Sequence, residues 1–181
     1  MDDFKVVFKP SIKLIKQAID LDKLVYENSA DVGDVDKCKS WIKKNNQIYT
    51  FLLNKDNLIG YINFMPVTET CYENFKQAII RDSEITSKDI VKFSNTKPNK
   101  CIFVSIVIHP DYQNGLEIRL LLKGFLNKLN NLKKENINIS HIIADCVSNI
   151  GEKAAVKFLK AKLIKESSKS KIYEAVFENS Y

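Results

Sequence analysis

The sequence predicts an α/β fold, a single domain with a mixed, mostly antiparallel sheet, a central parallel strand pair and flanking helices. Residues 100–108 form a near-continuous β-branched and aromatic run, typical of a strand buried on both faces. A polar loop follows this strand, and a helix with apolar residues at helical spacing begins at Leu116. The strands 48–53 and 58–67 form a hairpin, and the strand 141–147 completes a parallel crossover with the central strand.

Length and composition set limits on the class of protein. With 181 residues and a mass of 20.8 kDa, we expect residues 1–181 to form one domain with an ample core. No run approaches the roughly 18 apolar residues of a membrane span. The first residues are acidic, whereas a secretory signal begins basic and then turns apolar. We therefore expect a cytoplasmic protein that does not bind membranes.

Cysteine spacing and net charge argue against two other classes. The cysteines at 38, 71, 101 and 146 lack metal-ligand spacing, so we expect no metal site and no disulfide framework. The net charge is +6, from 28 basic and 22 acidic side chains. This lysine excess predicts solvated helix faces, with a polyanionic partner as the alternative. Nucleic-acid binding has only this excess in its favour, since no basic strand with interleaved aromatic residues occurs.

The first half of the chain predicts one strand and two helices before the hairpin. A strand covers 4–8, and Ser11 caps a helix with apolar residues through Leu24. Residues 28–34 predict a loop, and a short helix is expected over 35–44. Within the second hairpin strand, Gly60 indicates a bulge or a close contact.

The second half is less regular around the central strand. Helices are predicted over 72–80 and 87–93, before the central strand. After the strand 141–147, a last helix is predicted over 152–162, followed by a turn and a final alternating strand, 171–177.

The loop after the central strand points unpaired N–H groups and the positive end of a helix dipole at one spot, which favours a phosphate. This element order, with His-Pro-Asp-Tyr-Gln opening the loop, resembles the GNAT superfamily of acyl-CoA N-acyltransferases, best over 48–177. The motif of that family has Arg or Gln, two variable residues, Gly, one variable residue, then Gly or Ala. Gln113 matches the first position, but Leu116 and Ile118 occupy the glycine positions and Gly115 comes one place early. The motif is therefore degenerate.

The resemblance implies that acetyl-CoA is the co-substrate, and it implies where CoA binds. The end of the central strand would pair with the pantetheine amides like an added strand, and the loop would bind the pyrophosphate. The implied CoA-binding residues are Ile106, Val107, Ile108, Gln113, Asn114, Gly115, Leu116, Glu117, Ile118 and Arg119. Asn149 corresponds loosely to an asparagine that contacts CoA in the family; the alternative is a helix N-cap formed by Ser148 or Asn149.

In that family a substrate amine attacks the acyl thioester, a carboxylate accepts the ammonium proton and a tyrosine protonates the CoA thiolate. This chain has Val104 and Leu159 at the corresponding positions. Glu69 is a candidate base, with an ordinary exposed carboxylate as the alternative. Asp145 lies inside an apolar run and is a second candidate, with a hydrogen-bonded structural role as the alternative. Tyr49, Tyr61 and Tyr173 are expected to be core or sheet residues rather than acids.

The resemblance thus implies an N-acetyltransferase that moves an acetyl group from acetyl-CoA to an amine of unknown identity. Direct attack in a ternary complex is expected, because no cysteine has an obvious nucleophile setting. The protein is expected to be a monomer or a homodimer. The alternative is a catalytically weak or inactive CoA-binding or regulatory module on the same fold.

Overall fold

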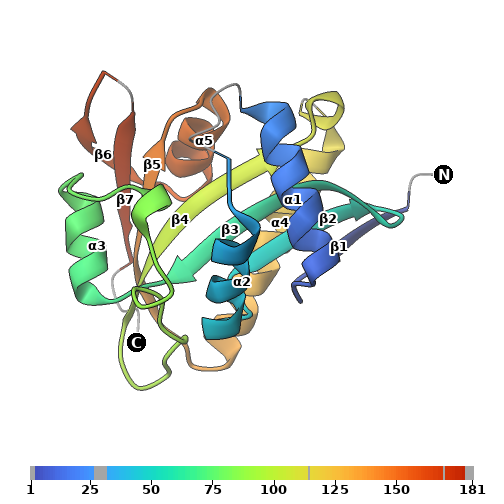
Figure 1. Ribbon diagram of the computed structural model, residues 1–181. Helices are drawn as coiled ribbons and strands as arrows, with labels where there is room; N and C mark the ends of the chain where they lie inside the picture. The colour runs from blue at the N-terminus through green and yellow to red at the C-terminus, as the bar shows by residue number, and fades with distance from the viewer. Residues whose placement is uncertain (1–2, 27–31, 114, 169, 178–181) are drawn as a thin grey trace. The chain divides into compact units, whose positions relative to one another are not determined.

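The computed structural model describes residues 3–26, 32–113, 115–168 and 170–177 (Figure 1). Seven strands are hydrogen-bonded in the order β1-β2-β3-β4-β5-β7-β6, and the pair β4–β5 is parallel. The predicted fold class, α/β with a mixed and mostly antiparallel sheet, is confirmed. The strands are β1 (Phe4–Val7), β2 (Tyr49–Asn54), β3 (Asn57–Pro66), β4 (Asn99–Ile108), β5 (Ile139–Cys146), β6 (Lys162–Glu166) and β7 (Lys171–Val176).

Five α-helices occur in the described residues, and their N-caps explain where several begin. They are α1 (Ile12–Val25), α2 (Val35–Lys44), α3 (Glu69–Lys76), α4 (Leu116–Lys134) and α5 (Asn149–Lys153). The hydroxyl of Ser11 accepts a hydrogen bond from Leu14 N–H, as the sequence predicts. Thr68 caps α3 in the same way, so this helix begins three residues before the predicted range 72–80.

Two predictions for the second half of the chain are wrong. The range 87–93 is not helical: Ile90 forms an isolated antiparallel bridge with Val67, which replaces helical hydrogen bonds with sheet-like ones. The predicted helix over 152–162 is divided into α5, a π-helical turn (Ala154–Phe158) and the strand β6. All five residues of β6 are exposed, and a bulge between Leu163 and Lys165 interrupts the alternation that marks a strand.

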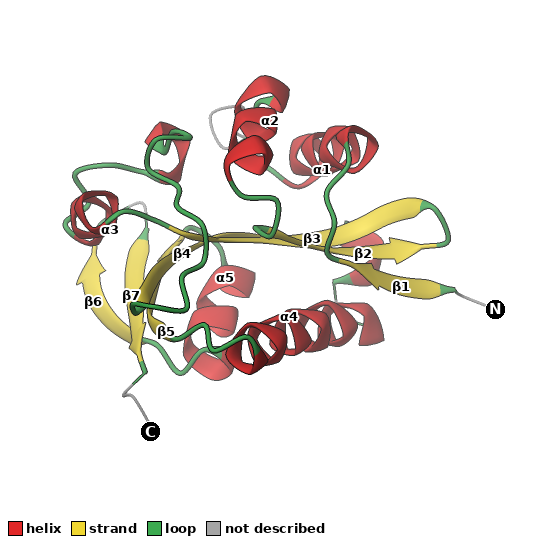
Figure 2. Ribbon diagram, turned by 90° about the horizontal axis from the view of Figure 1, so that it is seen from below, coloured by secondary structure: helices red, strands yellow, loops and turns green. Residues whose placement is uncertain are grey.

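The chain forms two compact units, residues 1–63 with 105–131 and residues 64–104 with 132–181. The assignment of all 181 residues to one domain stays a prediction. In the first unit, α1 and α2 cover one face of β2 and β3, while α4 covers the other face (Figure 2). The helix α4 approaches β1 closely at a glycine: a Cβ added to Gly124 would lie 2.7 Å from the side-chain atom Val6 Cγ1. Gly60 makes a close contact and lies beside a bulge. A Cβ added to Gly60 would lie 3.0 Å from Val107 O, and the β2–β3 register shifts next to this glycine.

In the second unit, α3 and α5 lie on opposite faces of the strands β5 and β7 (Figure 2). The parallel register joins Asn99–Ile102 of β4 to Ile139–Ile143 of β5. The Asn99 side chain supports this junction, since its Nδ2 donates to the carbonyls of Ser94, Lys97 and Asn138. Among the described residues, none of the helices combines the length and apolar character that crossing a membrane requires.

Candidate functional site

The loop after β4 is organised by a 3₁₀ turn (Pro110–Tyr112) at the strand end. His109 N–H donates to Ile59 O at 2.8 Å, and its Nδ1 accepts from Asp111 N–H at 3.3 Å. The side chain of Gln113 turns back, and its Nε2 donates to Ile108 O at 3.4 Å. The residue that matches the first position of the family motif therefore contacts the end of β4.

The helix α4 starts at Leu116, as the sequence predicts, but this side chain is not in the core. Leu116 is 60% exposed, whereas the buried stripe begins at Leu121, which is 0% exposed. Side chains in a first turn lean toward the N-terminal end of a helix, where only the loop precedes them. The apolar spacing that the sequence shows from Leu116 is therefore not buried at its first position. Ile118 is half-buried, Arg119 is exposed, and the predicted site residue Asn114 lies outside the described residues.

Glu117 occupies the loop in a way that the sequence does not reveal. Its carboxylate lies against Gly115, so that a Cβ added to that glycine would collide with Glu117 Oε2. The last residues of β4, Ile106, Val107 and Ile108, are buried on the same unit.

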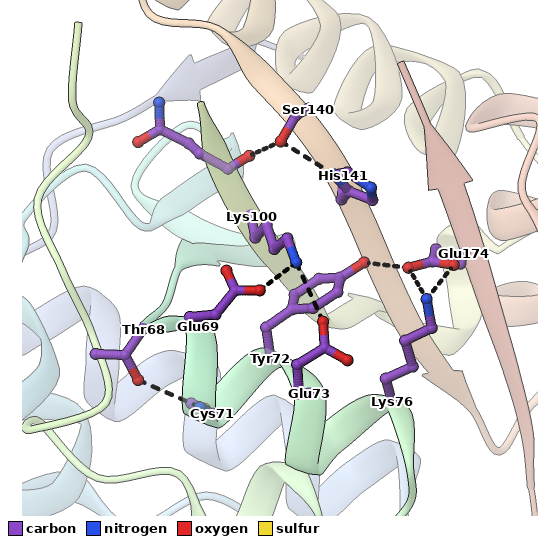
Figure 3. Close-up of polar contacts among 11 residues, drawn as sticks. Thr68, Glu69, Cys71, Tyr72, Glu73, Lys76, Lys100, Ser140, His141 and Glu174 are labelled. Atoms are coloured by element: carbon purple, nitrogen blue, oxygen red, sulfur yellow. Dashed lines mark hydrogen bonds and ion pairs between the residues drawn. The ribbon is translucent and has the colours of Figure 1, made fainter. Parts of the chain in front are cut away.

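The candidate base Glu69 belongs to an ion-pair network on α3 (Figure 3). Lys100 Nζ lies 2.5 Å from Glu69 Oε1 and 3.1 Å from Glu73 Oε1. The same ammonium lies 5.0 Å from the centroid of the Tyr72 ring. Burial lowers the pKa of Lys100, but the hydrogen bonds to both carboxylates raise it by more, so the lysine stays charged. Glu69 is therefore an exposed carboxylate neutralised by a lysine, which argues against its role as a base.

A third carboxylate, that of Glu174, is joined to this network through Tyr72 and is buried. Tyr72 Oη donates to Glu174 Oε1 at 2.7 Å, and Lys76 Nζ lies 2.8 and 2.9 Å from the two carboxylate oxygens (Figure 3). Burial raises the pKa of Glu174, but the hydrogen bonds from Lys76 and Tyr72 outweigh it and the net shift is downward. Burial and then the bond to Glu174 raise the pKa of Tyr72 well above its usual range. The sequence analysis missed Glu174, although a carboxylate at an inward position of an alternating strand was an available signal.

Asp145 differs from Glu69 in that part of its carboxylate has no partner. Its Oδ1 is buried and accepts no hydrogen bond from any described residue. The β5–β7 register sets Asp145 opposite Ile172, on the face that also carries Glu174. The paired residues of β4 and β5 end at Ile102 and Ile143, two residues before Asp145 on β5. Among the described residues, no hydrogen bond or ion pair joins Asp145 to Glu69.

Near the start of α5, the structure shows which residue is the N-cap, whereas the contact of Asn149 with CoA stays a prediction. Ser148 is the N-cap, and its Oγ accepts from Gly151 N–H at 3.2 Å; Asn149 is the exposed first helical residue. Tyr173 on β7 bonds to a residue of α5: its Oη donates to Glu152 Oε1 at 2.7 Å, and this bond raises the pKa of Tyr173 to about 12. Tyr173 is a buried sheet residue, as the sequence predicts.

The first unit contains a separate buried polar cluster under α1 and α2. Tyr61 Oη donates to Asp22 Oδ1 at 2.5 Å, and both residues are 5% exposed. Burial raises the pKa of Tyr49 well above its usual range, and Cys38 and Asn63 hydrogen-bond to its hydroxyl. Tyr49 and Tyr61 are thus core residues, as predicted.

Two absences concern possible metal or nucleophile sites. In the described part of the chain, no three His, Cys, Asp or Glu side chains are arranged to hold a metal ion. All four cysteines are free and buried. Burial is the largest cause that raises the pKa of Cys71 and of Cys146 to about 12, so neither is a thiolate at neutral pH.

Comparison with solved structures identifies the fold as that of the GNAT superfamily, in agreement with the resemblance seen in the sequence. Similar structures include the GphF GNAT-like decarboxylase in complex with isobutyryl-CoA (TM-score 0.65, 10% identity, covering 95% of this chain and 98% of that one). The loading GNATL domain of CurA from Lyngbya majuscula has a TM-score of 0.62 at 12% identity, covering 97% and 98% of the two chains. The PaiA N-acetyltransferase from Thermoplasma acidophilum, in complex with coenzyme A, has a TM-score of 0.53 at 12% identity, covering 97% and 99%.

Curated sequences similar to this chain are much longer proteins. Probable polyketide synthase 7 of Dictyostelium discoideum is 28% identical over 123 residues, which is 68% of this chain. The chain spans about 4% of the length of that relative. No protein-family profile matches the sequence.

Proposed function

We propose that the protein is an acyltransferase that moves an acetyl group from acetyl-CoA to an amine by direct attack in a ternary complex. The observation that carries the proposal is the unit formed by β4, its loop and α4 on a GNAT fold. The parallel register with β5 covers the first four residues of β4, and the loop then leads into a helix N-terminus. In this proposal, Ile106–Ile108 receive the pantetheine amides and the loop from Gln113 to Arg119 receives the phosphates.

Asp145 is the proposed general base. Its unpartnered, buried Oδ1 can accept a proton from a substrate ammonium, whereas Glu69 is already paired with Lys100. The free amine then attacks the thioester carbonyl carbon and the C–S bond breaks. The thiolate of CoA leaves and takes up the proton that the nitrogen of the new amide releases. This aspartate would replace the carboxylate that the family has on the neighbouring strand, where this chain has Val104.

Direct attack is favoured over a covalent acyl-enzyme. A cysteine nucleophile must be a thiolate, and the raised pKa values of Cys71 and Cys146, about 12 in both cases, oppose this. Burial likewise raises the pKa of Cys38.

A second candidate function has specific support from the comparisons. One structural neighbour is a GNAT-like decarboxylase, another is a loading domain, and the curated relatives are polyketide synthases. The protein would then remove carbon dioxide from a carboxyacyl-CoA and need no amine.

One experiment separates these functions. Purified protein is incubated with acetyl-CoA and a panel of amines, and free thiol is measured; malonyl-CoA alone is analysed by mass spectrometry in parallel. Amine-dependent thiol release supports the N-acetyltransferase. Conversion of malonyl-CoA to acetyl-CoA supports the decarboxylase, and CoA binding without either reaction supports the inactive binding module.

A further inference from the structure

The strand β6 forms one edge of the sheet, and its outer side is not paired with any strand that the structure describes (Figure 1). Its register joins it to β7 alone. All five of its residues are exposed, including Leu163 at 47% and Ile164 at 39%. An exposed strand edge presents backbone N–H and C=O groups that can pair with a further extended segment. The edge of β6 is therefore a candidate interaction surface.

The bulge in β6 places two lysines on the same face of the sheet. Directly opposite residues of antiparallel strands share a face. The register places Lys162 opposite Glu174. It places Lys165 opposite Ile172, which is two residues from Glu174 on β7 and so points to the same face. The two lysines are three residues apart, and the additional residue at the bulge, Ile164, allows both of them to lie on that face.

Within the described residues, neither of these lysines forms a salt bridge with a carboxylate. Lys165 Nζ donates to Gln77 O at 2.7 Å, at the C-terminal end of α3, and this neutral carbonyl leaves its charge in place. The acidic residue of β6, Glu166, lies 3.9 Å from Lys171 Nζ on β7 instead. Residues 153–168 contain five lysines and one glutamate, so their formal charge is 5 − 1 = +4, against +6 for the whole chain. The edge is therefore basic.

This arrangement opposes a second copy of the chain as the occupant of the edge. Two β6 strands that pair antiparallel across a twofold axis perpendicular to the sheet keep the same faces. The face with Lys162 and Lys165 would then meet the same two lysines of the other copy, and like charges opposite each other destabilise a sheet. Lysines and bulges are devices by which edge strands avoid such self-pairing. A strand with acidic residues on this face meets no such repulsion.

We infer that the edge of β6 binds an extended acidic segment of another protein, which adds to the sheet as a further strand. The segment carries Asp or Glu on the face of Lys162 and Lys165, and apolar residues on the opposite face, beside the exposed Leu163. Because the side chains of a strand alternate between two faces, the recognised sequence alternates acidic and apolar residues. Backbone hydrogen bonds join the strands, and the lysines select the partner. The inference does not depend on the reaction proposed above.

A series of short peptides tests the inference on the full chain. Calorimetry compares acetyl-Glu-Val-Glu-Val-Glu-Val-Glu-amide with the same peptide carrying Gln or Lys in place of Glu. We expect the Glu peptide to bind, the Gln peptide to bind roughly three- to thirtyfold more weakly, and the Lys peptide not to bind. High salt should weaken binding of the Glu peptide. N-methylation of one alternate set of its backbone amides should abolish binding, because only one set faces β6, and methylation of the other set should not.

Variants of the chain locate the peptide. Lys162→Gln combined with Lys165→Gln should weaken binding of the Glu peptide roughly three- to thirtyfold. The matched control combines Lys153→Gln with Lys157→Gln, which removes the same charge from exposed residues before β6 and should leave the affinity unchanged. Circular dichroism of each variant checks that it is folded.

Several results would overturn the inference. Equal binding of the Glu and Gln peptides would remove the role of charge, and equal losses in the two double variants would remove the role of β6. Absence of binding by the Glu peptide at about 1 mM would also refute it. A dimer in analytical ultracentrifugation whose dissociation constant changes in the Lys162 and Lys165 double variant would assign the edge to a second copy of the chain. The peptide series uses the wild-type protein, so it decides the inference even if a variant does not fold.

Discussion

Tyr72 on α3 and Glu174 on β7 are 102 residues apart in the sequence and share a hydrogen bond of 2.7 Å between the phenol and the carboxylate. Tyr72 is 0% exposed and Glu174 is 9% exposed, so this bond fixes the helix to the strand in a region that excludes water. Lys76, one turn further along α3, holds the same carboxylate.

Tyr72→Phe should lower the free energy of unfolding by about 1–3 kcal/mol, because it removes a hydrogen bond to a buried charged group. Urea denaturation followed by circular dichroism measures this change. Lys76→Met, at a lysine whose side chain is 37% exposed, should cost less since solvent screens the charge. Equal losses of unfolding free energy in the two variants would show that the hydrogen bond from the Tyr72 phenol contributes no more than the ion pair of Lys76.

Stability should fall on acidification because of Glu174. Its pKa in the folded state lies below its ordinary value of 4.5, so the ionised carboxylate stabilises the fold above that pH. This contribution is lost as the pH falls through the lowered pKa. Melting temperatures of the wild type and of Glu174→Gln, measured from pH 7 to pH 3, should therefore converge at the acid end. A difference in melting temperature that stays constant from pH 7 to pH 3 would contradict the lowered pKa of Glu174.

Asp145→Asn should reduce amine-dependent turnover by roughly 10²–10⁴-fold and leave CoA binding unchanged. The amide keeps the size of the side chain but cannot accept the ammonium proton. Glu69→Gln is the matched control, and it should retain most of the activity because Glu69 is paired with Lys100. If only the Glu69 variant lost activity, the general base would be Glu69 on α3 and not Asp145.

Arg119→Ala should weaken binding of CoA while changing the free energy of unfolding by no more than about 0.5 kcal/mol. Arg119 is exposed in the first turn of α4, where a cation opposes the helix dipole and a bound phosphate would compensate it. Calorimetry and chemical denaturation on the same preparation separate binding from folding. Unchanged CoA affinity in the variant would mean that the Arg119 side chain faces solvent and does not contact a bound phosphate.

Ile118→Gly should tighten CoA binding, because the second glycine position of the family motif would regain a backbone without a Cβ. The variant should also lose on the order of 1–3 kcal/mol of stability, since Ile118 is half-buried and glycine disfavours a helix. Titration of CoA into the variant and the wild type provides the comparison. Unchanged or weaker binding of CoA would refute the steric explanation.

The sequence predicts the parts of this fold that depend on local patterns. The hairpin, the buried run before Pro110 and the cap at Ser11 all follow from neighbouring residues. The strand β6 does not, since its exposed residues and its bulge give no alternation.

The candidate site was predictable only in part. Asp145 is recognisable as a carboxylate in an apolar run, but its unpartnered oxygen is a property of the packed structure. The pairing of Glu69 with Lys100 joins residues 31 positions apart, and no local pattern encodes it. The position of the Glu117 side chain depends on a rotamer, which spacing alone does not determine.

The interleaved make-up of the two compact units has a consequence for synthesis on the ribosome. The first unit consists of residues 1–63 and 105–131, so β1, β2 and most of β3 are made before their remaining partners. The ribosome must add 131 − 63 = 68 further residues before α4 can cover them, which takes roughly 3–14 seconds at 5–20 residues per second. During that interval an apolar sheet face is open on the nascent chain.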